Sequence, residues 1–288
     1  MFEAINSPWL VPFDGSFMRA DMPTAVDDVP DKKSYKKKLA GLVDELDDLQ
    51  RRLYASDKYS VLLIFQAMDA AGKDSTIRAV LSGVNPAGFQ VCSFKQPSAE
   101  ELDHDFLWRS AKRLPQRGRI GVFNRSYYEE TLVVRVHPEY LQGQKLPHKL
   151  DLGTLWQERF ESIRDHEKHL ARNGTVILKF WLNVSPEEQK RRFLSRIDEQ
   201  HKNWKFSAGD VKERSHWQDY MHAYEEALNE TSRPWAPWYA IPADDKSFMR
   251  LSVASIIVDS LSKLDLQYPE VTRAQREKIR GMRELLEK

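Results

Sequence analysis

Apolar positions follow two spacings along this chain, and each spacing predicts a different element. Across residues 34–54 apolar side chains recur at three- and four-residue steps, as one face of a helix requires. Residues 61–65 form an unbroken apolar run, and 176–182 form a nearly unbroken one. Runs of this kind are typical of strands that are buried on both faces.

Strand-like and helical segments then alternate along most of the sequence. Further strands are expected at 89–94, 119–123 and 238–241. Further helices are expected at 73–81, 100–114, 155–170, 186–197, 248–264 and 273–286. Repeated β-α units predict an α/β fold in three layers, with a parallel central sheet covered by helices on both faces.

The composition limits the class of protein. With 41% hydrophobic and 30% charged residues among 288, the chain is typical of a globular protein with a large core. The longest apolar run has five residues, far short of the roughly 18 to 20 of a membrane span, and the N-terminus shows no signal pattern. The single cysteine, Cys92, excludes an intrachain disulfide. We therefore expect a cytoplasmic protein without a membrane partner.

Three regions differ in their patterning. Residues 1–30 show no sustained period and are expected to form an extended arm. Residues 31–270 carry the alternating pattern and form the main domain. Residues 271–288 read as a separate C-terminal helix, which is either a contact surface or a solvated tail.

Net charge is +1, from 44 basic and 43 acidic residues, so the chain as a whole does not call for a polyanion partner. Two basic tracts nevertheless stand out. Residues 109–119 hold five cations and no acid, and residues 190–214 hold eight cations against four acids. No RNA-binding signature accompanies them, and no nucleic-acid partner is expected.

A candidate phosphate loop follows the first buried strand and opens a helix. Successive backbone N–H groups and the positive end of a helix form an anion cradle, and Lys73 after Gly72 can reach the outer phosphates. The loop departs from the usual G-x-x-x-x-G-K-[ST] pattern at Ala67 and Asp74. A tight turn of small residues with a solvated lysine is the simpler alternative.

Asp69 argues against that alternative. A carboxylate beside a phosphate cradle repels the ligand unless a cation lies between them, so Asp69 points to bound Mg²⁺. A second acid is usual at the end of a neighbouring strand, where this chain has the neutral Asn124, followed by Arg125 and then Glu129 and Glu130. Arg125 can grip a phosphate with its planar fork, and the acids can share the metal. A helix-capping Asn followed by a surface Arg is the alternative.

Five separated blocks resemble the family-2 polyphosphate kinases over residues 30–265. The blocks are 69–74 (DAAGKD), 94–97 (FKQP), 123–129 (FNRSYYE), 202–207 (KNWKFS) and 236–246 (APWYAIPADDK). Five blocks in the right order are far more specific than any one of them. Asn124, and the QAM sequence at 66–68, resemble the class III group of that family, which is associated with phosphorylation of both AMP and ADP.

The resemblance implies a thymidylate-kinase-like P-loop kinase fold with a helical lid at about 186–215. It implies reversible transfer of the terminal phosphoryl group of inorganic polyphosphate to AMP or ADP, without a covalent enzyme intermediate. Mg²⁺ is the implied cofactor, which Mn²⁺ can replace. Adenine nucleotides are the implied acceptors, with guanine nucleotides as an alternative, and a homo-oligomer is the implied assembly.

The resemblance also assigns roles to individual residues. Asp69 would hold the metal, and Arg125 and Lys95 would hold phosphates from neighbouring loops. Glu129 or Glu130 would position the metal or the nucleotide. The cradle of the transferred phosphate would comprise Ala70, Ala71, Gly72, Lys73, Asp74 and Ser75. The lid would contribute Arg192, Arg196, Lys202 and Lys205.

Two features of the sequence allow more than one interpretation. The tract at 109–119 suits a track for a long polyanion and equally suits a solvated helix end. Of the eight tryptophans, Trp204, Trp217, Trp235 and Trp238 could stack on an adenine, but core packing under a lid is the commoner use. For the whole protein, an ATP-dependent nucleoside or nucleotide kinase and a non-catalytic polyanion-binding protein remain the alternatives.

Overall fold

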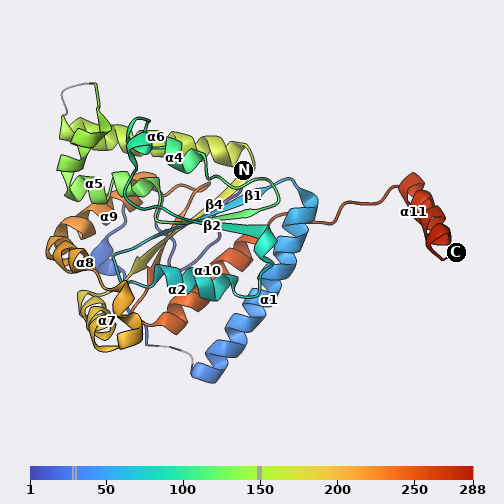
Figure 1. The fold of residues 1–288 in the computed structure, drawn as a ribbon, viewed down its shortest axis with the longest axis horizontal. Helices are drawn as coiled ribbons and strands as arrows, with labels where there is room; N and C mark the ends of the chain where they lie inside the picture. The colour runs from blue at the N-terminus through green and yellow to red at the C-terminus, as the bar shows by residue number, and fades with distance from the viewer. Residues whose placement is uncertain (28, 30, 148–150, 288) are drawn as a thin grey trace.

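The apolar runs of the sequence form one parallel sheet in the order β2-β3-β1-β4-β5 (Figure 1). The computed structural model describes residues 1–27, 29, 31–147 and 151–287. Its strands are β1 (Ser60–Gln66), β2 (Phe89–Ser93), β3 (Ile120–Asn124), β4 (Thr175–Asn183) and β5 (Trp238–Pro242). All residues of β1, β4 and β5 are buried, as continuous apolar runs predict, whereas the edge strand β2 is partly exposed. The predicted α/β fold with a parallel sheet is confirmed.

Helices cover both faces of this sheet (Figure 1). One face is covered by α1 (Lys32–Ser56), α2 (Lys73–Leu81) and α10 (Lys246–Ser262), which pack on one another. The other carries α4 (Trp108–Ala111), α5 (Val133–Val136), α6 (Leu152–Arg172) and α9 (Trp217–Thr231). The remaining helices are α3 (Ala99–Leu102), α7 (Pro186–Asp198), α8 (Ala208–Glu213) and α11 (Arg273–Leu286). Short 3₁₀ turns lie at Arg19–Asp21, Pro86–Gly88, Tyr127–Glu130, Pro138–Gln144, Gln200–Lys205 and Arg214–His216.

The single helix expected at 100–114 is wrong, because the structure has the two short helices α3 and α4 there. A capping box begins α3, with Ser98 accepting from the amide of Glu101 and Glu101 accepting from that of Ser98. In the segment between the two helices, the side chain of Asp105 accepts from the amide of Leu107, at 2.9 Å. A local aspartate bond of this kind competes with the helical ladder.

The N-terminal arm runs along the outer edge of β5. The amide of Val11 donates to the carbonyl of Trp238 at 2.9 Å, and the amide of Ala240 donates to that of Trp9 at 2.8 Å. Leu10 thereby forms an isolated antiparallel bridge with Tyr239, which shields an otherwise open sheet edge. The predicted end of the arm at Pro30, like Lys288 at the C-terminus, lies outside the described residues.

The strand register brings two loops to one edge of the sheet. Phe65 near the end of β1 pairs with Asn124 at the end of β3, so the segments that follow both strands emerge side by side. In the strand order, β2 lies next to β3 on one side of the β1–β3 pair, and β4 lies next to β1 on the other. The strand order therefore reverses at this pair. Ligands of open parallel sheets bind in such crevices. No helix among the described residues is long and apolar enough to cross a membrane.

Candidate active site

The loop between β1 and α2 has the backbone of an anion cradle. Gly72, at the N-cap of α2, has a φ of 113°, and a Cβ there would lie 3.1 Å from Met249 Cε. A side chain at this position would therefore be strained and crowded, and the cap supplies no side-chain bond to the first amides of α2. Ala70 also has a positive φ of 62°, which is rare outside glycine and concentrates at functional sites. Free amides at a helix N-terminus are suited to bind phosphate.

Lys73 is buried in this loop and folds back onto it. Its ammonium donates to the carbonyl of Ala67 at 2.7 Å and to that of Met68 at 3.4 Å. Burial and the charge of Arg125 together lower the pKa of Lys73 to about 8, against the opposing effect of Asp69. A buried cation held only by carbonyl groups is suited to meet an anion.

A chain of ion pairs links this loop to the segment after β3. Arg125 donates one N–H to Asp69 and another to Glu129 Oε2, the second at 2.7 Å. Gln66 donates to the other oxygen of Glu129 at 2.9 Å. The charge of Glu129 raises the pKa of Arg125. Burial opposes this effect and the charge of Asp69 adds to it, so the guanidinium stays charged. Arg125 itself has a φ of 65°, so its backbone is held in a strained conformation beside the loop.

Asn124 and Asp74 tie the same two segments together a second time. The amide of Asn124 donates to the carboxylate of Asp74 at 2.5 Å. Asp74 is the residue that stands where a phosphate loop usually has a hydroxyl, and Asn124 stands where an aspartate is common. The two departures from the usual pattern are therefore partners of one another, and they avoid the repulsion of two carboxylates.

Arg192 on α7 is fully engaged by the protein. Its Nε donates to Glu188 at 2.6 Å, and the other four N–H groups reach main-chain oxygens. These acceptors are the carbonyls of Ala70 and Ala71 in the phosphate loop and of Ala243 and Asp244 after β5. This guanidinium fixes α7 to the phosphate loop, and the phosphate contact expected of Arg192, which also lines the cleft described below, stays a prediction.

The other lid cations are held less tightly. Arg196 donates to the carbonyl of Lys205 and to Asp210, both at 3.3 Å. Lys202 bonds Ser195 at 2.8 Å and also Glu199, whereas Lys205 lies with its ammonium 4.9 Å from the centre of the Trp204 ring. In contrast to Arg192, these side chains are held by other residues of the lid and not by the phosphate loop.

Phosphate loop and lid enclose a cleft of about 850 Å³ above the sheet edge. Among the described residues that line it, nine are cationic and three are acidic. The cations are Lys73, Lys95, Arg125, Arg191, Arg192, Arg196, Lys202, Lys205 and Lys246, and the acids are Asp69, Asp74 and Glu199. The lining also includes Ala70, Gly72, Ser75 and Asn124 from the predicted cradle. Such an excess of positive charge within low-dielectric walls attracts polyanions.

Glu130 is not brought to this cleft. Its carboxylate is buried and accepts from Arg159 at 2.9 Å and from Gln144 at 2.6 Å, on the far side of the segment that carries Arg125. Successive residues of the 3₁₀ turn Tyr127–Glu130 point in different directions, so Glu129 faces the ion-pair chain and Glu130 faces the core. Glu130 acts as a structural partner of Arg159.

The first basic tract does not form one track. Arg109 is buried and donates to the carbonyl of Lys95 at 2.7 Å, close to the cleft. Arg117 and Arg119 precede β3 and therefore lie at the opposite edge of the sheet, where they donate to the carbonyls of Lys58 and Ala87. The interpretation of residues 109–119 as a continuous polyanion track is therefore wrong.

Three residues of the site were given no role by the sequence, although one of them, Lys246, ends the block at 236–246. Gln189 is buried, and its amide donates to the carbonyl of Asp69 at 2.9 Å. Its position three residues before Arg192 on one helix was the available clue. Asp210 pairs with Arg196, and Lys246 lines the cleft from the start of α10.

Trp204, expected in a core, is 79% exposed at the cleft, whereas Trp238 is buried as expected.

The donor set fits a divalent cation that shares its ligands with phosphate. Burial alone would raise the pKa of Asp69, but the charges of Arg125 and nearby cations hold it below its usual value, so this carboxylate is ionised at neutral pH. Both oxygens of Glu129 already accept hydrogen bonds. Among the described residues no group of three or more His, Cys, Asp or Glu could hold a metal by itself. Mg²⁺ typically binds one or two carboxylates, with phosphates and water as its other ligands.

Comparison with known proteins identifies the family. The family model for Polyphosphate kinase 2 (PPK2) matches residues 29–269. The chain belongs to the polyphosphate kinase 2 family. A polyphosphate kinase 2 from Arthrobacter aurescens TC1 has a similar solved structure, with a TM-score of 0.83 and 34% identity over 97% of this chain and 99% of that one. The fold is thus the P-loop kinase fold that the resemblance implied.

Two curated relatives of this polyphosphate kinase 2 family member carry more specific names. The ADP-polyphosphate phosphotransferase of Rhodopseudomonas palustris is 56% identical over 266 residues, 92% of each chain. The AMP/ADP-polyphosphate phosphotransferase of Meiothermus ruber is 44% identical over 248 residues, 86% of this chain and 88% of the relative. The two names differ in whether AMP is an acceptor.

Proposed function

We propose that this protein transfers the terminal phosphoryl group of inorganic polyphosphate to ADP and to AMP, reversibly and with Mg²⁺ or Mn²⁺ as cofactor. The observation that carries the proposal is the cleft, in which nine cations face three acids next to the phosphate loop. Such an excess suits a donor that is a chain of phosphates, because each phosphate adds charge for the cations to neutralise. The family and the names of both relatives support the same reaction.

The reaction needs little covalent chemistry from the protein. A phosphate oxygen of the nucleotide attacks the terminal phosphorus of polyphosphate, and the bridging P–O bond behind it breaks. The chain leaves one unit shorter, with the electron pair on its new terminal oxygen. Because the attacking oxygen is already ionised at neutral pH, the protein has to position the two substrates and stabilise charge.

The residues of the site divide this work between them. The amides after Ala70 and the Lys73 ammonium hold the transferred group, and Arg125 is placed to hold it from the β3 side. Arg196, Lys202 and Lys205 reach it from the lid. Asp69 would hold the metal, which would neutralise phosphate charge at this site. Arg192 keeps the lid helix in register with the loop.

The acceptor, the compartment and the assembly belong to the same proposal. Adenine nucleotides are the proposed acceptors, with guanine nucleotides as the competing base to be tested. A cytoplasmic location is proposed because the nucleotide substrates occur there and the one cysteine has no partner for a disulfide. We also propose that the protein self-associates.

The proposal is tested by asking which compound, polyphosphate or ATP, serves as the phosphoryl donor. Purified protein is given metal, long-chain polyphosphate and either AMP or ADP without ATP, and the products are followed by chromatography. We expect ADP and then ATP from AMP, no product after chelation of the metal, and product formation about 10²- to 10³-fold slower with the Lys73→Met variant. ATP formation from ADP alone would keep the polyphosphate reaction and exclude AMP. Phosphorylation by ATP but never by polyphosphate would replace the proposal with an ordinary nucleotide kinase.

A further inference from the structure

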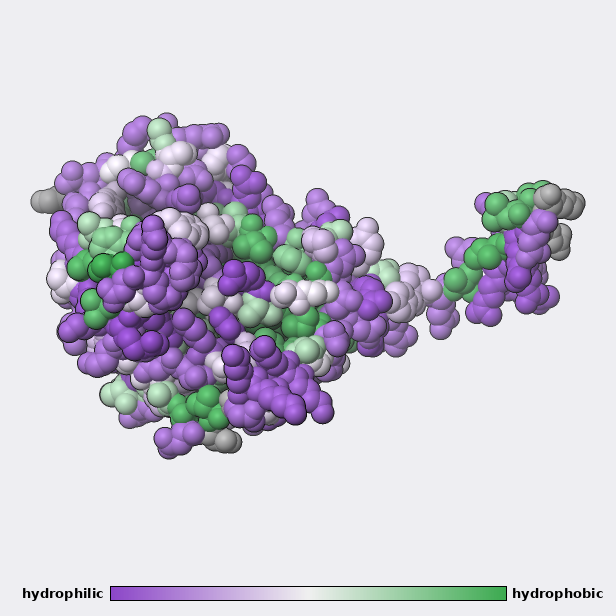
Figure 2. All heavy atoms as spheres, turned by 60° about the horizontal axis from the view of Figure 1, so that its bottom comes forward, coloured by the Kyte–Doolittle hydropathy of each residue, from purple (hydrophilic) through white to green (hydrophobic). Residues whose placement is uncertain are grey.

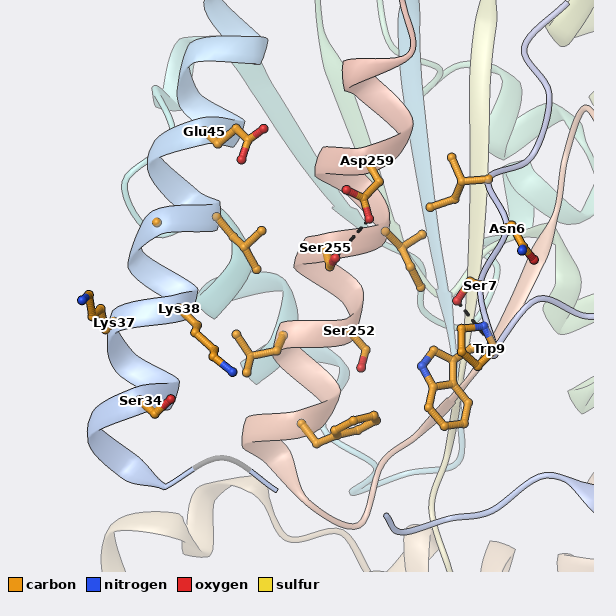
Figure 3. A pocket seen from close by; sticks show the side chains of 17 residues that line it. Asn6, Ser7, Trp9, Ser34, Lys37, Lys38, Glu45, Ser252, Ser255 and Asp259 are labelled. Atoms are coloured by element: carbon orange, nitrogen blue, oxygen red, sulfur yellow. Dashed lines mark hydrogen bonds between the residues drawn. The ribbon is translucent and has the colours of Figure 1, made fainter. Parts of the chain in front are cut away.

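A second hollow lies between the N-terminal arm, α1 and α10 (Figure 3). Its volume is about 1160 Å³, and apolar side chains of all three segments line it, among them Trp9, Leu42 and Leu251. Small residues widen it: a Cβ built on Gly41 of α1 would meet nothing within 4 Å, and Ser252 and Ser255 face it from α10. An apolar groove between two helices is a surface that typically accepts an amphipathic helix.

The chain itself carries an amphipathic helix without a packing surface. Ile279, Met282, Leu285 and Leu286 of α11 lie at three- and four-residue steps, and each is at least half exposed. Figure 2 shows apolar atoms along α11, which stands clear of the rest of the molecule. A helix of this length is marginal in water on its own, so its stability requires contact with another surface.

Connecting residues direct α11 away from its own body. From Gln267 to Thr272 the chain contains no turn or regular element, and Figure 1 shows it running outward from the end of α10. Pro269 fixes its own backbone and biases Tyr268 toward an extended conformation. A fold-back onto the groove of the same chain would need a reversal within these few residues, whereas an outward arm can reach a second molecule.

Charge along the groove matches the basic first turns of α11. Glu45 and Asp259 lie at one end of the groove and Lys37 and Lys38 toward the other (Figure 3). The first turns of α11 are basic, with Arg273 and Arg276 among them. Its last turn holds Arg283, followed by Glu287, so at that end the negative end of the helix dipole is what favours the lysines. The helix therefore fits with its N-terminus at the acidic end.

We propose that α11 of a second copy of this chain lies in this groove, and that the first copy returns its own α11 to the partner's groove. Ile279, Met282 and Leu286 face the apolar lining, and the basic first turns lie beside Glu45 and Asp259. Because each copy gives one helix and receives one, the contact is self-complementary and closes as a two-fold dimer.

Light scattering on the full chain measures the dimer dissociation constant and tests the role of α11. Ile279→Glu with Met282→Glu alters only the apolar stripe of α11, and we expect the dimer dissociation constant to rise at least about tenfold. Arg280→Gln, on the opposite face of the same helix, is the control and should leave the constant unchanged. A natural protein that is monomeric at every concentration, or a dimer that the double variant does not weaken, would overturn the proposal.

The groove has its own variant and control. Gly41→Gln places a side chain in open groove space while improving a helix position of α1, so we expect weaker dimers and no loss of unfolding free energy. Ala40→Gln, its exposed neighbour outside the groove lining, should leave the dimer intact. Equal dimerisation of both variants would place the interface elsewhere.

Disulfide trapping distinguishes an α11 that binds the groove of a second copy from an α11 that folds back onto the groove of its own copy. In a Cys92→Ser background, one chain carries Ser252→Cys and another carries Met282→Cys, and the two are mixed under mild oxidation. A cross-linked pair containing one chain of each kind is expected. In a chain that carries both substitutions, a link formed only within one molecule would show that α11 covers its own groove and would overturn the proposal.

Discussion

Replacing Lys73 with methionine separates what catalysis requires from what the fold tolerates. Burial, followed by the charge of Arg125, lowers the pKa of Lys73 from its ordinary 10.5 to about 8. That drop corresponds to about 3 kcal/mol by which folding disfavours the charged side chain. Methionine loses the bond to the Ala67 carbonyl, worth about 1–2 kcal/mol. At neutral pH we expect the variant to be about 1–2 kcal/mol more stable, with activity lowered about 10²- to 10³-fold.

The pH dependence of this difference follows from the sign of the shift. Between pH 8 and 10.5 the unfolded chain binds a proton at Lys73 that the folded chain has released. The free energy of unfolding of the natural protein therefore rises with pH across this window, relative to that of the variant. Below the window the advantage of the variant is constant, and toward its upper end the advantage disappears.

Urea unfolding of both proteins without substrate, at neutral pH and at about pH 10, measures the difference. Lys205→Met is the control, because Lys205 also lines the cleft but is exposed, and its removal should change stability by less than about 0.5 kcal/mol. The reasoning is refuted if Lys73→Met is less stable than the natural protein at neutral pH. An advantage that stays constant up to about pH 10 would equally refute the assigned pKa.

Four further substitutions test the roles of other residues. Asp69→Asn should lower kcat about 10²- to 10³-fold with the melting temperature kept, because it removes the ionised carboxylate proposed to hold the metal. Arg192→Met should cost about 2–4 kcal/mol of unfolding free energy as well as activity, whereas Arg196→Met should cost activity alone, since only Arg192 is fully bonded within the protein. Glu130→Gln should cost about 3–5 kcal/mol of stability, measured by urea unfolding, while folded enzyme keeps its kcat.

Each of these has an outcome that would contradict it. Full activity of Asp69→Asn would remove this carboxylate from the metal site. Equal stability of the two arginine variants would show that the bonds of Arg192 do not fix α7 to the phosphate loop. A large fall in kcat for folded Glu130→Gln would return Glu130 to the active site.

The sequence by itself determined the strands and the phosphate loop. Both are local patterns: the apolar runs of β1 and β4 can be satisfied only by burial on both faces, and Gly72 with Lys73 at a strand-to-helix turn fixes where anions can bind. The helix starts at Ser98 and Ser185 are also local, because a cap bonds amides within three residues. Asp69 lies beside this loop and pairs with Arg125, and its role as a metal ligand stays a prediction.

Only the tertiary structure decided what each charged side chain touches. Arg192 and Arg196 share a helix face, yet one is bonded to carbonyls 122 and 51 residues away and the other keeps weak partners in the lid. Glu129 and Glu130 are neighbours, yet one joins the site and the other the core. A periodic pattern records which face of an element is buried. The partner of a charge depends on segments far apart in the chain, whose meeting is set by the packing of the whole fold.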